Sequence, residues 1–350
     1  MNSFRNTQRD AIGDAGSGPR GGSFGGDAYE AVVVGGGAAG LSAALVLGRS
    51  RRRTLVVDAG EPRNAPSAHM QGYLSRDGMS PAGFLAEGRR EIAGYGVEWR
   101  SGEVTGAAPD GADGFVLTLA DGGTVRARRL VVTTGLVDEL PEIDGLADRW
   151  GRDVLHCPYC HGWEVRDLPF GVVAHPAMPA HQALVVSQWS GDVTLFLHGA
   201  ELSDRDAALL DAAGVRVVAG EVAGLVVTDD RLTGVRLADG RVVERSVVFA
   251  GAKRLAARDG VLRQLGADLR ETPFGEFVVV DETGRTSVPG VWAAGNVTGP
   301  QEQVVNAASL GYRAAATING ELLMTDLEAK AAARSGAGDP AGREGDGSAA

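Results

Sequence analysis

The N-terminal part of the chain alternates short apolar runs with a stretch of helical periodicity. Residues 29–34 form an apolar run with the length and composition of a buried parallel strand. A glycine-rich segment at 35–40 follows at once, and residues 41–48 place small and apolar side chains at helical spacing. A second apolar run at 54–57 ends at Asp58. The pattern predicts a β-α-β unit at the start of the folded chain.

Further strands and helices are predicted downstream of this unit. Residues 61–83 are interpreted as a loop because Pro62, Pro66 and Pro81 interrupt any helix. The pattern then predicts, in order, a helix at 84–94, a strand at 97–100, a hairpin of 115–119 with 124–128, and a buried strand at 130–134.

A second unit of the same kind follows a predicted linker at 141–151. The pattern predicts a strand at 171–174, a helix at 180–189, a strand at 193–197, a helix at 204–213, a strand at 215–218, a hairpin centred on Asp239-Gly240 and an end near residue 251. The chain then returns to the style of the first unit, with a strand at 277–280 and a helix at 304–323. We therefore predict an α/β protein with two Rossmann-like, three-layer (ββα/αβ) domains.

The glycine spacing of the first unit matches the dinucleotide-binding fingerprint. The motif Gly35-x-Gly37-x-x-Gly40 lies between a strand and a helix, and Asp58 ends the next strand. Gly35 permits a tight turn, Gly37 lets the backbone approach a pyrophosphate, and Gly40 lets helix and strand pack closely. The helix N-terminus offers N–H groups to the phosphates, and Asp58 is placed to accept hydrogen bonds from a ribose diol. We interpret the unit as a dinucleotide site.

Composition and charge narrow the class of protein without defining its chemistry. The chain has 350 residues, 44% hydrophobic and 23% charged, which is typical of a globular protein of about two domains. The net charge of −11 argues against nucleic acid and anionic membranes as partners. No stretch approaches the ~18–20 consecutive apolar residues that span a bilayer. We expect disordered tails at 1–27 and 326–350, which are rich in glycine and other small or charged residues.

The only two cysteines, Cys157 and Cys160, form a CxxC flanked by His156 and His161. Four kinds of site fit this pattern: a redox-active pair, a zinc site, c-type haem attachment and two inert core cysteines. Zinc is disfavoured because adjacent Cys and His residues cannot easily aim at one ion and no second Cys/His cluster exists, so we predict no metal. Haem attachment requires export, and residues 1–27 contain no signal-peptide core. We favour the redox pair and a cytosolic (cytoplasmic) location.

Three blocks of the sequence together resemble the thioredoxin-reductase-like flavoprotein family: the glycine fingerprint, the CxxC, and Gly295-Asn296 before the last helix. The resemblance implies FAD as cofactor and a homodimer. It implies an FAD-binding domain at 28–138 and 253–325, split by an inserted NADPH-domain-like unit at 139–252 that carries the CxxC. The implied FAD contacts are Gly35, Gly37, Ala38, Ala39, Gly40, Asp58, Gly135, Gly295, Asn296, Gln303 and Val304. Asn296 stands where the family usually has aspartate, and an amide still forms hydrogen bonds.

The second domain departs from the family where a nicotinamide cofactor binds. After the strand at 171–174 the chain reads His-Pro-Ala-Met-Pro-Ala, without a glycine to relieve crowding around a pyrophosphate and with two prolines that lack N–H donors. Residues 197–201, after the next strand, contain no Arg or Lys to hold a 2′-phosphate. We therefore expect no NADPH binding. This departure matches a branch of the family, the FAD-dependent dithiol oxidases of gliotoxin- and holomycin-type pathways, which the run from Cys157 to Glu164 also resembles.

The resemblance to this branch implies an FAD-dependent dithiol oxidase. Cys157 would exchange with a small-molecule dithiol, Cys160 would face the flavin, and O2 would reoxidise the flavin to give H2O2. The residues leave open whether His156 or His161 is the base that takes the substrate proton. A thioredoxin-disulfide reductase fed by NADPH or ferredoxin is the alternative function. The sequence does not identify the dithiol.

Overall fold

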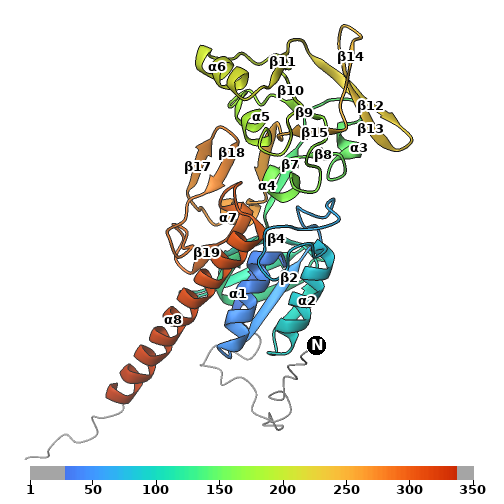
Figure 1. Cartoon of the computed structure of the whole chain (residues 1–350). Coiled ribbons are helices and arrows are strands. Elements are labelled where there is room, and N and C mark those ends of the chain that lie inside the picture. Colours follow the sequence, from blue (N-terminus) through green and yellow to red (C-terminus); the bar gives the residue numbers. More distant parts are fainter. Residues whose placement is uncertain (1–27, 337–350) are drawn as a thin grey trace, which may run out of the picture.

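The structure is a computed structural model that describes residues 28–336. The tail predicted at 1–27, and the part of the second tail from residue 337 onward, lie outside the described residues. Figure 1 shows two domains, with the N-terminal and C-terminal segments together in the lower one and the middle of the chain in the upper one. The predicted α/β fold with two Rossmann-like domains is confirmed.

The first domain is a parallel sheet between a helical layer and a β meander. Its elements are β1 (Tyr29–Val34), α1 (Ala38–Arg49), β2 (Thr54–Asp58), α2 (Pro81–Ala93), β3 (Glu98–Ser101), β4 (Val104–Pro109), β5 (Phe115–Leu119), β6 (Thr124–Val132), α7 (Gly260–Gln264), β17 (Leu269–Thr272), β18 (Gly275–Val278), β19 (Val291–Ala293), the 3-10 helix η1 (Gly295–Val297) and α8 (Val304–Gly336). The sheet order is β3-β2-β1-β6-β5-β4, and β19 pairs with the end of β6. Strands β1, β2, β3, β6 and β19 are parallel, which is the arrangement of a dinucleotide-binding domain.

Buried β-branched residues explain why β1 lies at the centre of this sheet. Val33 is paired with Val56 of β2 and Val131 of β6, and all three are fully buried. A strand that is covered on both faces reads as a continuous apolar run, as β1 does. One face packs against α1, α2 and α8, including Leu47 and Ile318, and the other packs against β5 and α7. Both faces of the sheet are therefore core.

The inserted domain repeats this three-layer plan and carries the CxxC on the side that faces the first domain. Its elements are α3 (Leu146–Arg149), β8 (Val154–Leu155), α4 (Pro158–His161), β9 (Phe170–Val173), α5 (His181–Val186), β10 (Val193–Phe196), α6 (Asp204–Ala212), β11 (Arg216–Val218), β12 (Val222–Thr228), β13 (Arg231–Leu237), β14 (Val242–Glu244) and β15 (Val247–Ala250). The parallel sheet has the order β11-β10-β9-β15-β8. Helices α5 and α6 cover one face, and the antiparallel sheet β12-β13-β14 covers the other.

The chain passes between the two domains twice, and the two crossings pair with each other. Strands β7 (Leu136–Glu139) and β16 (Arg254–Ala257) form a two-stranded antiparallel sheet. The first predicted boundary, at 138/139, falls within β7, and the second, at 252/253, lies just before β16. These domain boundaries stay predictions. The two-stranded ribbon formed by β7 and β16 is the connection between the two domains.

Three helices differ from the sequence-based expectations. Pro81 was expected to interrupt a helix, but α2 begins there, because Ser80 accepts a hydrogen bond from the N–H of Gly83 at 3.1 Å and proline is well tolerated in the first turn. The predicted linker at 141–151 contains the short helix α3. The helix predicted at 180–189 is shorter, since α5 ends at Val186.

The last helix is much longer than predicted, and this corrects the disordered tail expected from residue 326. Helix α8 continues to Gly336 through an alanine-rich stretch of high helix propensity. Asp326 also anchors it to the sheet, since its carboxylate pairs with Arg52 at 3.0 Å and with Arg128 at 2.7 Å. These two arginines are nearly buried, so the ion pairs hold the helix where the sequence alone suggests fraying.

We expect Asp326→Ala to destabilise the fold by about 1–3 kcal/mol, because it removes one acceptor from each of two largely buried guanidinium groups. Chemical denaturation measures the change in the free energy of unfolding. Glu328→Ala, an exposed acid two residues further along α8, is the matched control and should change it by less than about 0.5 kcal/mol. Equal effects of the two substitutions would contradict the anchoring role.

Candidate active site

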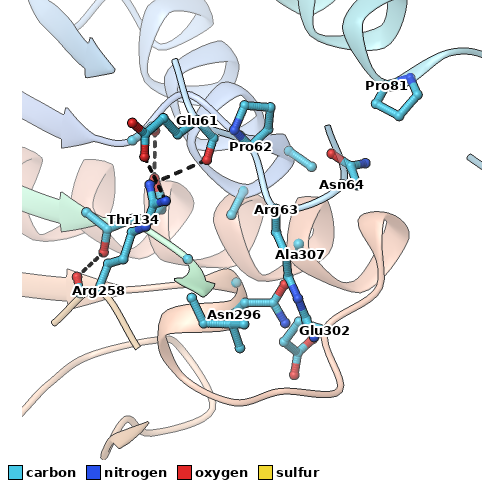
Figure 2. A pocket seen from close by; sticks show the side chains of 18 of the residues that line it. Glu61, Pro62, Arg63, Asn64, Pro81, Thr134, Arg258, Asn296, Glu302 and Ala307 are labelled. Carbon is cyan, nitrogen blue, oxygen red and sulfur yellow. Dashed lines mark hydrogen bonds and ion pairs between the residues drawn. The ribbon is translucent and has the colours of Figure 1, made fainter. Parts of the chain in front are cut away.

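A cavity of about 790 Å³ lies at the carboxyl ends of the parallel strands and extends to the CxxC. Figure 2 shows part of its lining, with residues from the loop after β2, from the end of β6 and from the segment before α8. The carboxyl edge of a doubly wound sheet is where such folds bind ligands. All the predicted site residues line this cavity except Gly40, which packs beneath it.

The three fingerprint glycines have three different structural roles. Gly35 has φ +104°, and a Cβ there would lie 2.6 Å from the carbonyl oxygen of Thr133. A Cβ on Gly40 would collide with the carbonyl oxygen of Gly35. A Cβ on Gly37 would meet no protein atom within 4 Å, because this residue faces the open cavity. The turn therefore leaves free space at the N-terminus of α1, where unpaired N–H groups favour a phosphate.

Asp58 is held rigidly at the end of β2. Its carboxylate accepts hydrogen bonds from the N–H of Gly36 at 2.7 Å and from the N–H of Gly60 at 3.2 Å. The carboxylate lines the cavity and keeps further lone pairs for a ribose diol. Gly36 also packs closely on Trp99 and on the Asp58 carboxyl group, so a larger residue at this position would displace the acid. The geometry fits the role predicted for Asp58.

Asn296 does more than replace an aspartate. Its Nδ2 donates to the carbonyl oxygens of Gly299 at 3.0 Å and Pro300 at 3.2 Å, bonds that a carboxylate cannot donate. Arg63 donates to the same Pro300 oxygen at 3.3 Å and forms a bidentate pair with Asp138 at 2.7 Å. The side chains of Asn296 and Arg63 thus hold the segment before α8. The side-chain oxygen of Asn296, Oδ1, can still accept a hydrogen bond from a ligand.

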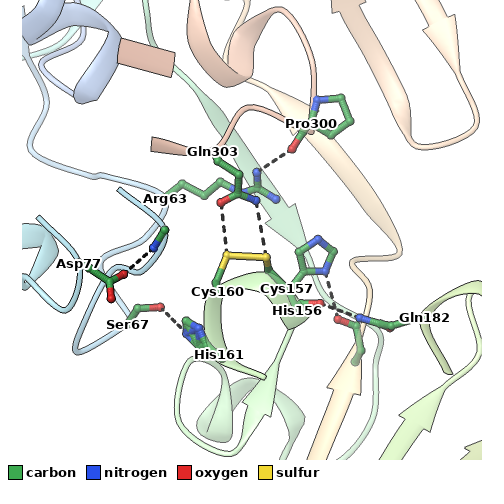
Figure 3. Close-up of a disulfide and its surroundings, with 12 residues drawn as sticks. Arg63, Ser67, Asp77, His156, Cys157, Cys160, His161, Gln182, Pro300 and Gln303 are labelled. Atoms are coloured by element: carbon green, nitrogen blue, oxygen red, sulfur yellow. Dashed lines mark hydrogen bonds between the residues drawn. A yellow bond between two sulfur atoms is a disulfide. The ribbon is translucent and has the colours of Figure 1, made fainter. Parts of the chain in front are cut away.

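The two cysteines form a disulfide at the inner end of the cavity. Cys157 precedes the short helix α4 and Cys160 lies within it, which brings their Cα atoms to 5.3 Å. Figure 3 shows the disulfide facing Gln303 of the first domain, with His156 and His161 on either side. The Gln303 amide oxygen lies 3.3 Å from Cys160 Sγ, and its nitrogen lies 3.6 Å from Cys157 Sγ. The structure therefore brings the predicted redox pair to the predicted cofactor cavity.

Desolvation by the surrounding protein favours the neutral form of both flanking histidines, although His156 is exposed and His161 only half-buried. Desolvation lowers the pKa of His156, and the nearby charge of Arg63 lowers it further, against the opposing effect of Asp138. Desolvation also lowers the pKa of His161, with Glu164 opposing. His156 Nδ1 lies 3.3 Å from the carbonyl oxygen of Ala250, so this nitrogen carries the proton and Nε2 is the basic one.

His161 has a different environment. Its Nε2 lies 3.4 Å from Ser67 Oγ, and its buried Nδ1 has no hydrogen-bond partner among the described residues. The structure therefore offers two neutral imidazoles next to the disulfide, and each can accept a proton.

Several cavity residues escaped the sequence analysis. They are Glu61, Arg63, Thr134, Arg258 and Glu302. Arg258 pairs with Glu61 at 2.9 Å, and burial raises the pKa of Glu302, with Arg313 opposing. Thr134 could have been found, since it lies two residues after the end of a buried parallel strand. The other four lie in loops whose contacts are long-range, and no local pattern marks them.

Residues 28–336 contain neither a membrane-spanning helix nor a metal-binding cluster. No helix there combines the length and apolarity needed to cross a membrane, and no group of three or more His, Cys, Asp or Glu side chains is arranged to hold a metal ion. The cytosolic location stays a prediction.

The fold and the site define a class: an oxidoreductase with two dinucleotide-binding-type domains and a CxxC disulfide at its cofactor cavity. A family comparison agrees, since the pyridine nucleotide-disulphide oxidoreductase profile matches residues 29–311. The chain belongs to this family.

Individual relatives narrow the class to thioredoxin-reductase-like proteins. The chain is 31% identical to the thioredoxin reductase sirT of Leptosphaeria maculans, over 86% of this chain and 97% of the relative. It is 32% identical to the thioredoxin reductase tcpT of Claviceps purpurea, over 84% and 94%. The crystal structure of HlmI is similar, with 49% identity, a TM-score of 0.84, and coverage of 90% of this chain and 99% of that one.

The predicted cofactor and enzyme class are confirmed by these relationships: the protein is an FAD-binding thiol/disulfide oxidoreductase. The cavity fits FAD because the glycine turn leaves open space at the N-terminus of α1, and Asp58 stands beside it. The roles of individual residues stay predictions.

The fingerprint glycines provide a test of the FAD site. Gly37→Ala should leave the thermal unfolding midpoint of the apoprotein unchanged, because its Cβ meets no protein atom and its φ of −73° suits alanine. It should lower FAD content at least about tenfold, since the Cβ enters the pyrophosphate space. Visible absorbance per protein measures FAD content.

Gly40→Ala is the contrasting variant. Its Cβ collides with backbone, so we expect loss of folded protein as well as loss of FAD. Normal FAD retention in Gly37→Ala would refute the assigned role of this residue.

Proposed function

We propose that the protein is an FAD-dependent dithiol oxidase, which forms a disulfide in a small-molecule dithiol and passes the electrons to O2 to give H2O2. One observation carries this proposal. The loop of the inserted domain that would hold the pyrophosphate of a nicotinamide cofactor offers few free N–H donors. The CxxC and a cavity that fits FAD are nevertheless both present.

Four of the six residues 175–180 have no free N–H group to offer a ligand. Pro176 and Pro179 have none, the N–H of Ala177 donates to His175 Nδ1 at 3.2 Å, and the N–H of Met178 donates to the carbonyl oxygen of His175 at 3.0 Å. The His175 ring packs against Phe274 at 5.4 Å between centroids. A pyrophosphate has few donors here, which supports a flavin reduced by a dithiol.

The segment after β10 also lacks the features of an NADPH site. Residues 197–201 carry no Arg or Lys. His198, the one residue there with a basic side chain, uses Nδ1 to accept a hydrogen bond from the N–H of Val222 at 3.1 Å. A 2′-phosphate therefore has no cation to pair with at this point of the chain.

The cysteines carry out two exchange steps in this proposal. A substrate thiolate attacks Cys157 Sγ, the Cys157–Cys160 bond breaks, and its electron pair leaves on Cys160 Sγ. The second substrate thiolate then attacks the first substrate sulfur and releases Cys157 as a thiolate. The substrate loses two electrons and two protons, and the enzyme dithiol holds the two electrons. Bound FAD would supply the two-electron acceptor for the enzyme dithiol, and O2 would be the final oxidant, giving H2O2 with two protons.

The neutral histidines supply the base. A substrate thiol is mostly protonated at neutral pH, and only its thiolate is nucleophilic. His156 Nε2, or a nitrogen of His161, takes that proton before the attack on Cys157.

A thioredoxin-disulfide reductase is the second candidate. The names of the relatives sirT and tcpT favour it. It requires an electron donor for the flavin, NADPH or ferredoxin, where the oxidase requires only the substrate dithiol. The homodimer implied by the family belongs to both proposals.

Anaerobic titration of the flavin separates the two candidates. We expect a small dithiol such as dithiothreitol to bleach the flavin absorbance and NADPH to leave it unchanged. Admission of O2 should restore the colour and release about one H2O2 per dithiol oxidised. Cys160→Ser should abolish bleaching by the dithiol, with FAD content unchanged. Bleaching by NADPH would overturn the oxidase proposal.

The pH dependence of kcat/KM should identify the base. Because desolvation lowers the pKa of both histidines, the rate should persist below the ordinary value of about 6.5 and fall as pH drops through the lowered pKa. His156→Asn and His161→Asn should be compared. The variant that loses this acid limb and at least about tenfold in rate at pH 7 contains the substituted base. An acid limb unchanged in both would exclude the histidines.

A further inference from the structure

The side chain of Gln303 reaches from the first domain to the disulfide of the second (Figure 3). Its amide oxygen lies 3.3 Å from Cys160 Sγ and its amide nitrogen 3.6 Å from Cys157 Sγ. The family resemblance concerns the backbone of Gln303 at the flavin and gives no reason for the side chain to face the sulfurs. A primary amide presents a donor and an acceptor in one plane, and here each faces a different sulfur.

We propose that the Gln303 amide stabilises the cysteine thiolate that forms when the Cys157–Cys160 bond opens. The inference rests on the proposed function, in which substrate attack opens this bond. An N–H donated to a thiolate is a charge-assisted hydrogen bond, which is about twice as strong as one between neutral groups. The amide oxygen at the same time accepts a hydrogen bond from the partner cysteine when that is a thiol. One amide can thus form a hydrogen bond with each cysteine when one of the two is a thiolate and the other a thiol.

The same side chain serves both exchange steps. Attack on Cys157 Sγ forms the mixed disulfide and places the electron pair of the broken bond on Cys160 Sγ. Half a turn about the terminal torsion of Gln303 directs its N–H to Cys160, because the two ends of the amide are nearly equal in shape. Release of the product then leaves a thiolate on Cys157, and the reverse half turn returns the amide nitrogen to the position that it has at Cys157 in the disulfide form.

The flanking histidines are oriented elsewhere. The Nε2 atom of His161 faces Ser67 Oγ, and Nδ1 of His156 faces the carbonyl oxygen of Ala250. Neither imidazole forms a hydrogen bond to a sulfur among the described residues, so a histidine that has taken the substrate proton adds charge nearby but no direct hydrogen bond to the thiolate. Among the described residues, Gln303 is the side chain that contacts both sulfurs, and this makes it a catalytic residue for the exchange steps.

The test measures the acidity of the thiols in the holoenzyme. The enzyme is reduced anaerobically with a phosphine, and the rate of alkylation by iodoacetamide is followed against pH. Gln303→Met keeps the length of the side chain but removes the hydrogen bonds. We expect its alkylation midpoint to rise by about one pH unit, and the anaerobic rate of flavin bleaching by dithiothreitol to fall about tenfold.

A charged variant gives a second, independent signature. Gln303→Glu places a carboxylate against the thiolate, so the bleaching rate should fall about a hundredfold at neutral pH and recover in part as the carboxyl is protonated. Gln301→Glu adds the same charge two residues earlier, at an exposed position outside the cavity lining. This matched control should keep the wild-type alkylation midpoint and bleaching rate.

The outcomes separate this inference from the proposed function. If Gln303→Met keeps the wild-type alkylation midpoint, the inference is overturned, whatever its FAD content. If its FAD content is also reduced, the residue serves cofactor binding alone. A raised midpoint in an enzyme whose flavin is bleached by NADPH would support the thiolate role while overturning the oxidase.

Discussion

The close approach of α1 to its neighbours is the constraint on which the rest of the site depends. Backbone meets backbone at two glycines: Gly40 lies against the carbonyl oxygen of Gly35 below α1, and Gly311 of α8 lies against that of Ala39 beside it. A methyl group at either position would separate these elements. Because α1 packs closely on the sheet and on α8 beside it, its N-terminus opens into the cavity next to the start of α8, where Gln303, the residue just before that helix, reaches the disulfide.

The proposed electron path rests on the difference between two loops, one open to a dinucleotide and one with few free donors. The turn after β1 leaves space and N–H donors for a dinucleotide, whereas the turn after β9 spends its donors on His175 and replaces others with proline. The two domains have the same layered plan, so the difference between them lies in a few turn residues and not in the fold. The family's chemistry can change direction in this way without any change in architecture.

Local features were predictable from the sequence, and long-range ones were not. The glycine turn, Asp58 and the CxxC are short local motifs, so their spacing was enough to predict that they meet at one cavity, while their individual roles stay predictions. The start of α2 was missed because proline was treated only as a breaker, although Ser80 before it is a strong cap. The end of α8 depends on Asp326 meeting Arg52 and Arg128, and the loop position of Arg63 depends on Asp138. Such pairs join residues far apart in the chain, and no local pattern records them.

The paired crossings β7 and β16 have a consequence for motion between the domains. Two separate linkers could twist independently, but these strands are hydrogen-bonded from Leu136–Ala257 to Glu139–Arg254, so they bend as a single ribbon. Asp138 in this ribbon holds Arg63, which in turn lines the cofactor cavity and reaches Pro300. The joint between the domains is therefore tied to the wall of the FAD site. A twist of this joint would move Asp138 and, through it, Arg63, so a change in the angle between the domains would also change the wall of the cavity.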